Sequence, residues 1–597
     1  MSVEKKLVFS TRKLVFFRLA RMKGDEIMSK KKEDKGFSRR YFIQGSAITA
    51  AGLASAGLLA GCSTKETPPA DQGAAGGVKK WSWETKPAPI PASEIKKTVD
   101  TEVLVIGAGL AGTVAALSAQ EAGAKVTIID KNETVAFRGG HITAFNSKVQ
   151  QQMGIKNDYR QVVRRWIYWA QGRVKEDMLW LFAHKSGACF DWVLDQVAPR
   201  GLKVAMWDGY FKGPDYTEYP VTHFFYKDGT NFIYTNGNIE GAGNAVLLPI
   251  LEQIIKEKGI GLDYKTPAVQ LVRDGSGPVK GVIAGAKGNY TQYNASKGVI
   301  IATGDYASDK EMIEKYAPYA LKMDAQLYFP NKCNTGDAHK MAMWAGGAMQ
   351  QVEPHAGVIH LEAGANSYGF LHINALGQRY KNEDVNTQSK SVTKIYQPNN
   401  IAWTIYDADG LSQVKQQIDS GVGGGLFYGQ TFQRMGTKFD LAAEQQILDG
   451  QLKNGKVVTA NTLEELAKKM NVPADAFVAT VKRYNELVAA KNDSEFGKRA
   501  ELLTPIVKAP FYAGKLLSTI LTMVGGLRTN TNLNVLDEND KPIQNLYVAG
   551  SAAGDFFAND YPTICPGIGH GRCITFGRLA GLIAAGKSAD DVPSLKI

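Results

Sequence analysis

Cysteine is scarce in this sequence. It occurs five times in 597 residues, at positions 62, 189, 333, 565 and 573. No two cysteines form a C-x-x-C pair, which argues against a disulfide framework, a cysteine-ligated zinc site and covalently attached c-type haem. Charged residues make up 21% and apolar residues 44%, with 62 Gly and 22 Pro. This composition excludes a disordered, collagen-like or multi-span membrane chain and predicts a soluble globular body.

Most of the chain also has little excess of positive over negative charge. The net charge is +12, but residues 1–61 hold 13 Lys or Arg against five Asp or Glu, so the rest of the chain carries only +4. The excess therefore lies in the N-terminal segment and not along the body, where nucleic-acid binding would need it. We expect no nucleic-acid partner.

The N-terminal segment has the layout of an export signal. Four lysines between residues 30 and 35 precede Ser38-Arg39-Arg40, and an apolar run rich in Ala and Gly extends to Cys62. This order is typical of the twin-arginine export route. Leu-Ala-Gly-Cys at its end is similar to a lipobox, in which Cys62 receives the lipid. The alternatives are an ordinary membrane anchor or a chance arginine pair.

These features predict a lipoprotein that the twin-arginine translocase exports and that stays on the cell membrane, facing the exterior or the periplasm. Residues 1–61 are then the signal, and residues 62–100, rich in Pro, Ala, Gly and Lys, are a flexible tether. Met28 is a more natural start than Met1, because export does not need the first basic stretch. The route carries folded proteins and is used chiefly for those that take up a cofactor first, so it also predicts a cofactor.

A dinucleotide-binding pattern follows at residues 101–131. An apolar strand leads into Gly107-x-Gly109-x-x-Gly112, an Ala-rich helix follows, and a second apolar strand ends at Asp130. Gly107 permits the tight turn, Gly109 lets the backbone approach a pyrophosphate, and Gly112 lets helix and strand pack closely. The phosphates then lie at the helix N-terminus, and Asp130 accepts hydrogen bonds from a ribose.

The rest of the chain favours FAD over NAD. Gly139-Gly140 follows the second strand, residues 298–304 form an apolar strand with a small-residue turn, and residues 545–550 repeat that pattern near the C-terminus. Contacts from both ends of a chain suit the longer cofactor. We expect FAD to be held without a covalent bond, attachment through His141 being the weaker alternative. The predicted FAD-binding residues are Gly107, Gly109, Leu110, Ala111, Gly112, Asp130, Lys131, Gly139, Gly140, Thr143, Val269, Thr303, Gly304, Gly550, Ser551, Gly567, Ile568 and Gly569.

A series of further motifs resembles the soluble fumarate reductase flavoprotein family, whose relatives include urocanate reductase and 3-ketosteroid dehydrogenase. They are Thr266-Pro-Ala-Val, Gly377-Gln-Arg-Tyr-Lys-Asn-Glu383, Thr462-Leu-Glu-Glu-Leu-Ala467, Thr480-Val-Lys-Arg-Tyr-Asn485 and Gly525-Gly526. The resemblance implies an α/β fold with a Rossmann-like FAD-binding domain in two segments, residues 101–350 and 515–597. It places an α+β capping domain, residues 351–514, between them, with the substrate where the two meet.

Three groups by which the family holds a dicarboxylate are missing. Thr387 stands where the family's proton-donating arginine is expected, four residues after Glu383, and no histidine precedes Gly525-Gly526. The segment 561–564, where a second arginine is expected, contains none. Because a dicarboxylate needs fixed cationic partners to offset its desolvation, we expect poor turnover of fumarate.

The resemblance implies hydride transfer between flavin N5 and a carbon of an activated C=C bond. We assign the acid to Tyr561, since Tyr561-Pro-Thr falls near the family's substrate-binding segment; the alternative is a tyrosine packed in a loop. His570 and Arg572, before the last helix, are assigned to stabilising reduced flavin or a substrate oxyanion. Their alternatives are a hydrogen bond at the helix terminus and a surface cation.

Several other residues are assigned to structure. His355, His360 and His372 lack metal-ligand spacing, so we expect hydrogen-bonding roles and no metal site. The tryptophans at 166, 169 and 180 have helical apolar spacing, which predicts a buried stripe. Tyr396 and Trp403 are expected in the core rather than in an aromatic substrate pocket.

Three functions remain open. The first is an exported FAD-dependent reductase of an enone, enoate or aromatic acrylate, supplied with electrons by a membrane quinol-linked cytochrome or flavoprotein. The second is the reverse reaction, a ketosteroid-type dehydrogenase. The third is a flavoprotein without substrate chemistry, which acts as an electron relay or a ligand-binding protein.

Overall fold

The computed structural model describes residues 79–137, 139–206, 218–229, 234–235, 238–239, 242–327, 332–362, 369–420, 422 and 441–597. The predicted signal and Cys62 lie outside these residues. Residues 79–597 form one compact unit. Within the described part, no helix is long and apolar enough to span a membrane.

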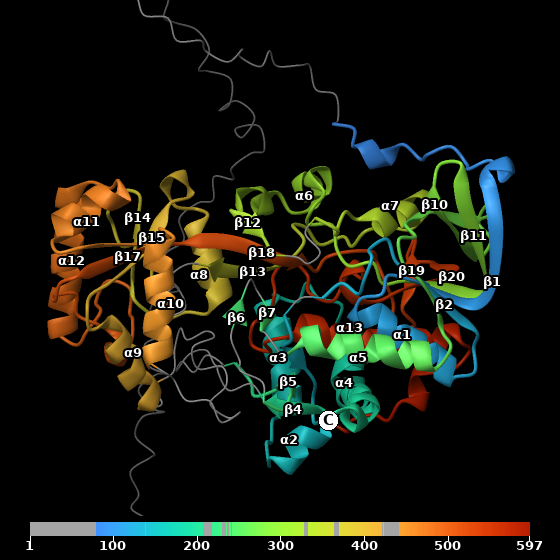
Figure 1. Ribbon diagram of the computed structural model, residues 1–597, viewed down its shortest axis with the longest axis horizontal. Coiled ribbons are helices and arrows are strands. Elements are labelled where there is room, and N and C mark those ends of the chain that lie inside the picture. Colours follow the sequence, from blue (N-terminus) through green and yellow to red (C-terminus); the bar gives the residue numbers. More distant parts are fainter. Residues whose placement is uncertain are drawn as a thin grey trace, which may run out of the picture. The chain divides into compact units, whose positions relative to one another are not determined.

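An eight-stranded sheet organises the N- and C-terminal parts of this unit (Figure 1). Its main path runs β19-β20-β11-β1-β2-β8, and the strands from β20 to β8 are parallel. β10 pairs antiparallel with β11, and β9 pairs antiparallel with β10. The strands are β1 (Ile95–Ile106), β2 (Val126–Ile129), β8 (Gly261–Asp263), β9 (Ala268–Arg273), β10 (Val279–Ala286), β11 (Asn289–Ile301), β19 (Asn534–Leu536) and β20 (Pro542–Val548).

The central strands are buried on both faces because helices cover the sheet, which is why β2 consists only of Val, Thr and Ile. α1 (Leu110–Glu121) lies between α5 (Asn244–Glu257) and α13 (Ile568–Ala584) (Figure 1). Helices from the N-terminal and the C-terminal parts of the chain thus lie in the same layer against the sheet. Together with the parallel sheet this confirms the predicted α/β class.

α1 and α13 approach each other backbone to backbone. A Cβ at Gly581 would lie 2.1 Å from the carbonyl oxygen of Ala115, and one at Gly577 would lie 2.6 Å from that of Ala111. Gly112 fits equally tightly on the other side of α1, where a Cβ would lie 1.9 Å from the carbonyl oxygen of Gly107. Small residues at these positions let the two helices close on the sheet.

Two three-stranded sheets and one two-stranded sheet accompany the large one. β3 (Ile142–Thr143), β5 (Thr222–Lys227) and β4 (Leu202–Met206) pair in that order, next to α2 (Lys148–Gln152), α3 (Tyr159–Trp169) and α4 (Glu176–Val197). β12 (Ala325–Gln326), β18 (Leu517–Met523) and β13 (Gly357–Glu362) form another, near α6 (Lys310–Tyr316) and α7 (Asp337–Trp344). β6 (Tyr234–Thr235) pairs with β7 (Asn238–Ile239).

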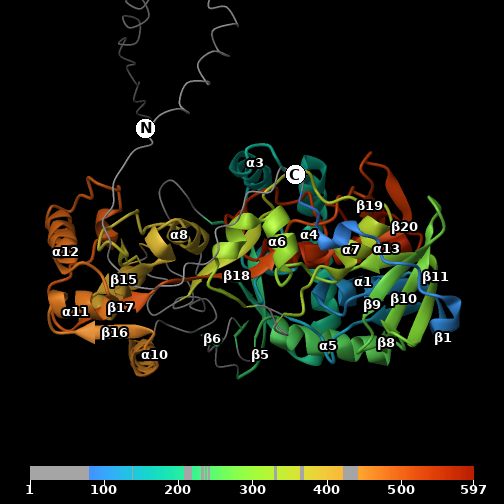
Figure 2. The same cartoon turned by 90° about the horizontal axis from the view of Figure 1, so that it is seen from above.

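The segment inserted before β18 carries a four-stranded sheet of its own, in the order β14-β15-β17-β16. Figure 2 labels three of these strands, β15, β17 and β16. α11 and α12 cover one face and α9 and α10 the other, each over a separate apolar core. The elements are β14 (Leu371–Asn374), α8 (Thr387–Lys394), β15 (Ala402–Tyr406), α9 (Gly410–Asp419), α10 (Leu441–Lys453), β16 (Val457–Ala460), α11 (Leu463–Met470), α12 (Ala474–Ala489) and β17 (Phe511–Lys515).

A buried ion-pair network fixes the loops of this inserted part. The guanidinium of Arg379 pairs with the carboxylates of Glu383 and Asp493 at 2.8 Å, and Lys498 lies 3.3 Å from Glu383. These charged partners hold the pKa of Glu383 below its usual value although burial raises it. Arg379 and Glu383 come from the predicted Gly377–Glu383 motif, and both have a structural role here.

The structure corrects three expectations. Residues 79–100 are not all tether, since Trp83 is buried against Tyr316 and β1 already begins at Ile95. Of the predicted tryptophan stripe only Trp166 is fully buried, while Trp169 and Trp180 are partly buried against the same core. The stripe is also not continuous, because Trp180 lies in a second helix, residues 176–197. Tyr396 is 63% exposed and belongs to no core, whereas Trp403 lies in the core under α11 and α12.

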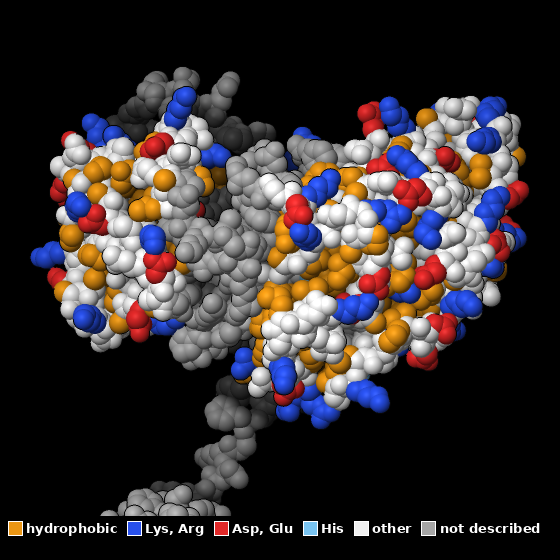
Figure 3. Space-filling view, turned by 60° about the horizontal axis from the view of Figure 1, so that its bottom comes forward, with side chains coloured by type: hydrophobic (Ala, Val, Ile, Leu, Met, Phe, Trp, Pro, Cys, Tyr) orange, Lys and Arg blue, Asp and Glu red, His pale blue; other side chains and the backbone are white. Residues whose placement is uncertain are grey.

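Cationic and anionic side chains are interspersed over the face shown in Figure 3. That face carries no broad field of one sign.

We predict that Gly581→Ala lowers the free energy of unfolding by about 1–3 kcal/mol, since its methyl group must push α13 away from Ala115. Urea denaturation measures the change. Gly450→Ala is the matched control, because Gly450 lies in α10 with no atom within 4 Å of an added Cβ. Equal midpoints for the two variants would contradict the close contact.

Candidate functional site

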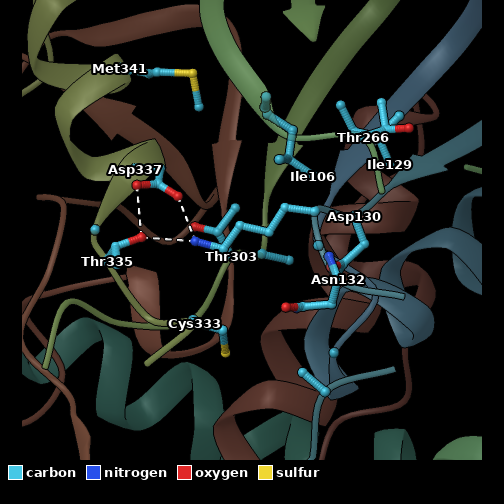
Figure 4. Close-up of a pocket in the computed structure, with 18 residues that line it drawn as sticks. Ile106, Ile129, Asp130, Asn132, Thr266, Thr303, Cys333, Thr335, Asp337 and Met341 are labelled. Carbon is cyan, nitrogen blue, oxygen red and sulfur yellow. Dashed lines mark hydrogen bonds and ion pairs between the residues drawn. The ribbon is translucent and has the colours of Figure 1, made fainter. Parts of the chain in front are cut away.

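A pocket opens at the carboxyl ends of β1, β2 and β11, where the parallel strands meet the start of α1 (Figure 4). This edge is the general place for ligands in such sheets. The lining residues are Ile106, Gly107, Gly109, Ile129, Asp130, Lys131, Asn132, Ala136, Thr266, Ala268, Ala302, Thr303, Gly304, Cys333, Thr335, Gly336, Asp337 and Met341.

The turn into α1 leaves room for phosphate. Gly107 adopts φ +107°, a conformation that L side chains rarely take, and a Cβ there would lie 2.4 Å from the carbonyl oxygen of Ala302. At Gly109, the residue that precedes α1, an added Cβ meets only the carbonyl oxygen of Ala136 at 3.8 Å. The first-turn N–H groups of α1, which begins with Leu110 and Ala111, have no acceptor inside the helix, so they are available to an anion.

Asp130 connects this turn to the end of β2. Its carboxylate accepts hydrogen bonds from the N–H groups of Ala108 and Asn132, both at 2.7 Å. Each oxygen keeps a second lone-pair direction for a ligand hydroxyl. Asp130 therefore fixes the phosphate turn and faces the pocket at the same time.

Lys131 extends toward the opposite wall. Its Nζ lies 2.6 Å from Oδ2 of Asp337 and 2.8 Å from Oγ1 of Thr335, and Figure 4 shows these two residues across the pocket from Asp130. Thr335 and Asp337 are not among the residues predicted from the sequence. The signal was present, since Thr335-Gly336-Asp337 is a small-residue turn directly before a helix, like the other turns assigned to the cofactor.

Not every predicted residue lines this pocket. The side chain of Val269 does not, whereas that of Ala268 does, since successive strand side chains point to opposite faces. Gly550 instead packs on α1, where its added Cβ would lie 2.9 Å from Cβ of Ala111. Ser551 follows, with its Oγ 3.4 Å from that of Thr522 in β18.

The remaining predicted residues meet at the start of α13. Thr143 donates its N–H to the carbonyl oxygen of Gly567 at 3.2 Å and its hydroxyl to that of Pro566 at 2.8 Å. A Cβ on Gly567 would lie 2.4 Å from the backbone of His141, and one on Gly140 would lie 2.3 Å from Cα of Gly243. The loop carrying Gly139 and Gly140 thus lies against the start of α13, where Ile568 and Gly569 form the first turn.

His141 and His570 are neighbours in this second region. Nδ1 of His570 lies 3.0 Å from the carbonyl oxygen of His141, and its Cε1 lies 3.4 Å from an added Cβ on Gly139. Burial, and then the nearby His570, lower the pKa of His141 to about 3. His141 is therefore a neutral ring at neutral pH.

Tyr561 is buried, and its hydroxyl oxygen accepts a hydrogen bond from the N–H of Gly569 at 3.0 Å. Burial raises the pKa of this phenol, while the Gly569 N–H and the positive charge of Arg572 lower it. No described residue accepts the proton of this hydroxyl. The phenol therefore has a free donor and two groups that stabilise its negative form.

Arg572 lies in α13 and is fully buried. Its Nη1 donates to the carbonyl oxygens of Val524 at 3.3 Å and Ala553 at 3.0 Å, and its Cζ lies 4.6 Å from the ring centroid of Phe557. Nε and Nη2 have no partner among the described residues. Burial lowers its pKa to about 10, so the guanidinium remains charged at neutral pH and offers two unused donors.

Asp305, which directly follows Gly304, connects the pocket to β18. It accepts hydrogen bonds from the N–H of Met523 at 2.9 Å and from the hydroxyl of Thr522. Burial raises its pKa to about 6. The sequence analysis did not assign this residue, because a single Asp after a glycine turn carries no recognisable pattern.

The described residues contain no group of three or more His, Cys, Asp or Glu that could hold a metal ion. The residues described above fit a dinucleotide cofactor whose second end lies near the start of α13. The glycine turn and α1 suit a pyrophosphate, Asp130 suits a ribose, and the start of α13 brings Tyr561 and Arg572 to the other region.

We predict that Gly109→Ala leaves the fold intact but weakens cofactor retention, because its methyl group meets only Ala136 and otherwise enters the pocket. Gly112→Ala must disturb the fold itself, since a Cβ there would lie 1.9 Å from the carbonyl oxygen of Gly107. Visible flavin absorbance and circular dichroism separate the two effects. Full flavin retention by Gly109→Ala would contradict the assignment of the pyrophosphate turn.

Known proteins resemble this chain over most of its length. Vinyl phenol reductase of Lactiplantibacillus plantarum is 27% identical over 511 residues, which cover 81% of this chain and 96% of the relative. Probable fumarate reductase Ifc3 of Shewanella frigidimarina is 26% identical over 551 residues, covering 85% and 82%. The solved structure of 3-ketosteroid-Δ4-(5α)-dehydrogenase from Rhodococcus jostii RHA1 has the same fold, with a TM-score of 0.65 at 22% identity, covering 84% of this chain and 100% of that one.

A family model described as an FAD binding domain matches residues 102–563, which is more than half of the chain. The match spans the glycine turn, Asp130 and the inserted part, and it confirms both the resemblance and FAD as cofactor. The chain belongs to this FAD-binding family and is an FAD-dependent oxidoreductase.

Proposed function

We propose that this chain is an exported, lipid-anchored reductase that saturates the activated C=C bond of an external acceptor, such as an enone, an enoate or an aromatic acrylate. The observation that carries the proposal is the buried Tyr561 hydroxyl, which is held by Gly569, lies near Arg572 and keeps its proton free. When bound, FAD supplies the hydride from its N5 to one carbon of the double bond.

Tyr561 delivers the proton to the neighbouring carbon. The N–H of Gly569, at the N-terminus of α13, and the guanidinium of Arg572 stabilise the phenolate that is left. The free Nε and Nη2 of Arg572 stabilise negative charge that develops on the activating group of the acceptor. His570, beside Gly139, is the third candidate group, for the reduced flavin.

The acceptor that this site suits is not a dicarboxylate. Thr387 is the first residue of α8 and its hydroxyl oxygen accepts from the N–H of Leu361, so no cation occupies that position. A dicarboxylate would have to be desolvated with one buried arginine near Tyr561 rather than a set of cationic groups. The name vinyl phenol reductase supports an aromatic acceptor, while the similarity to a probable fumarate reductase makes fumarate the comparison to test.

The proposed location rests on the N-terminal sequence alone, with Arg39-Arg40 for the twin-arginine translocase and Cys62 for the lipid anchor. An enzyme outside the cytoplasm cannot draw on cytoplasmic NADH. Since the sequence contains no haem motif and no second flavin-attachment signature, we propose a membrane quinol-linked cytochrome or flavoprotein as the electron donor.

The function is tested with chain purified from Ser63 onward, loaded with FAD and reduced anaerobically with dithionite. We expect an enone, a vinyl phenol or an aromatic acrylate to reoxidise the flavin at least about tenfold faster than fumarate, since one lost charged hydrogen bond already costs that much. Stopped-flow flavin absorbance measures the rates. Fumarate turnover equal to the best acceptor would contradict the substrate class, and reduction of oxidised enzyme by a ketosteroid would favour the dehydrogenase.

Tyr561→Phe tests the acid. We expect reoxidation by the best acceptor to slow by about a hundredfold or more, because no proton is delivered, while the flavin is still bound and reduced by dithionite. Single-turnover absorbance measures this step. Tyr406→Phe is the matched control, since Tyr406 is a buried tyrosine of the inserted part whose hydroxyl has no hydrogen-bond partner among the described residues. Unchanged reoxidation by Tyr561→Phe would show that another group donates the proton.

A further inference from the structure

Helix α3 has one buried and one cationic face. Val162, Val163 and Trp166 pack into the core. Arg160, Arg164 and Tyr168, spaced four residues apart, are exposed, and so is Arg165. We call these four exposed residues the α3 face. Tyr168 is 87% exposed. In Figure 2, α3 lies at the upper edge of the described elements.

Most of the charge of the α3 face has no acidic side chain beside it in the part of the chain that the structure describes. Among the described residues, no carboxylate side chain lies within ion-pair distance of its three arginines or of Arg173, although exposed Lys and Arg elsewhere form such pairs. Arg160 donates to an oxygen of the main-chain carboxylate of Ile597 at 3.1 Å, and Arg173 contacts Oδ1 of Asn559 at 3.3 Å. Arg164 and Arg165 are therefore the arginines of the α3 face without a carboxylate partner among the described residues. The nearest acids along the chain are Asp158, which caps α3, and Glu176 and Asp177 at the start of α4.

The buried face of the same helix leads directly to the reactive groups. The ring centroids of Trp166 and Phe557 are 5.9 Å apart, and those of Phe557 and Tyr561 are 5.2 Å apart. Cζ of Arg572 lies 4.6 Å from the Phe557 ring. Trp169 adds a hydrogen bond from its indole N–H to Oδ2 of Asp560, the residue before Tyr561, at 3.0 Å. One helix thus separates solvent from the proposed reaction site.

We propose that the α3 face is where an acidic one-electron carrier protein docks to deliver electrons to the bound cofactor. The inference rests on the proposed function, which needs an external electron donor. Two reduced carriers are each oxidised by one electron, and these two electrons together with two protons from solvent reduce one C=C bond. Docking at α3 brings the carrier close to the site, which matters because electron transfer slows steeply with distance.

A protein partner explains the α3 face better than an anionic membrane. Charge complementarity alone would suit either. The aromatic contacts behind α3, however, end at Tyr561 and Arg572, and only an electron donor would benefit from that position. An exposed tyrosine among arginines is also the composition expected at the core of a protein interface.

The test compares two charge-reversal variants of the FAD-loaded chain from Ser63 onward. Arg164→Glu/Arg165→Glu changes the α3 face, and Lys468→Glu/Lys482→Glu changes the net charge equally on exposed parts of α11 and α12. The donors are reduced flavodoxin, an acidic carrier, and reduced methyl viologen, a small cation. We expect the α3 variant to lose about tenfold or more in its second-order rate with flavodoxin at low salt, and high salt to remove the difference.

Viologen-driven turnover should change less than about twofold in both variants, which keeps failure of docking distinct from failure of the proposed reaction. Equal flavodoxin rates for the two variants would overturn the α3 assignment. So would an inability of flavodoxin to reduce the unchanged protein while viologen does. Loss of binding to phosphatidylglycerol vesicles in the α3 variant, without a change in flavodoxin rate, would assign the surface to a membrane instead.

Discussion

The backbone contact between α1 and α13 is the constraint on which the rest of the site depends. α1 begins at the turn that fits the pyrophosphate, and α13 begins at the loop that holds Tyr561 and carries Arg572 within its first turns. Gly577 and Gly581 bring the two helices together closely enough that neither could bear a side chain. The spacing between the nucleotide end and the reactive end is therefore set by helix packing, and the loops around it inherit that spacing.

Burial sets the properties of the groups to which we assign the chemistry. Arg572 has no acidic partner among the described residues, and two carbonyl groups and the rings of Phe556 and Phe557 surround its charge. An unpaired buried cation is costly, and two of its donors remain unused, which is the state expected of a group kept for a ligand. Arg379 presents the contrast, since two carboxylates neutralise it and its position is structural.

The sequence predicted the α/β class, the strand-turn-helix of residues 101–131 and the FAD cofactor, because those signals are local and each glycine has a steric reason. It did not predict Thr335 and Asp337, which line the pocket beside Lys131, or Asp305, which binds the backbone of β18 and has no pattern of its own. The prediction that Tyr396 packs in the core was wrong for a related reason, since aromatic character does not tell which side of an element faces solvent. The division into domains stays a prediction.

The pairing of α1 with α13 also bears on the order of synthesis. α1 is among the first elements to be made and α13 is the last helix, so the small-residue surface of α1 has no partner until nearly the whole chain has been translated. Strands β1 and β2 can pair early, but β20 and α13 must wait. The nucleotide cradle is therefore complete only when α13 has been made and has packed on α1.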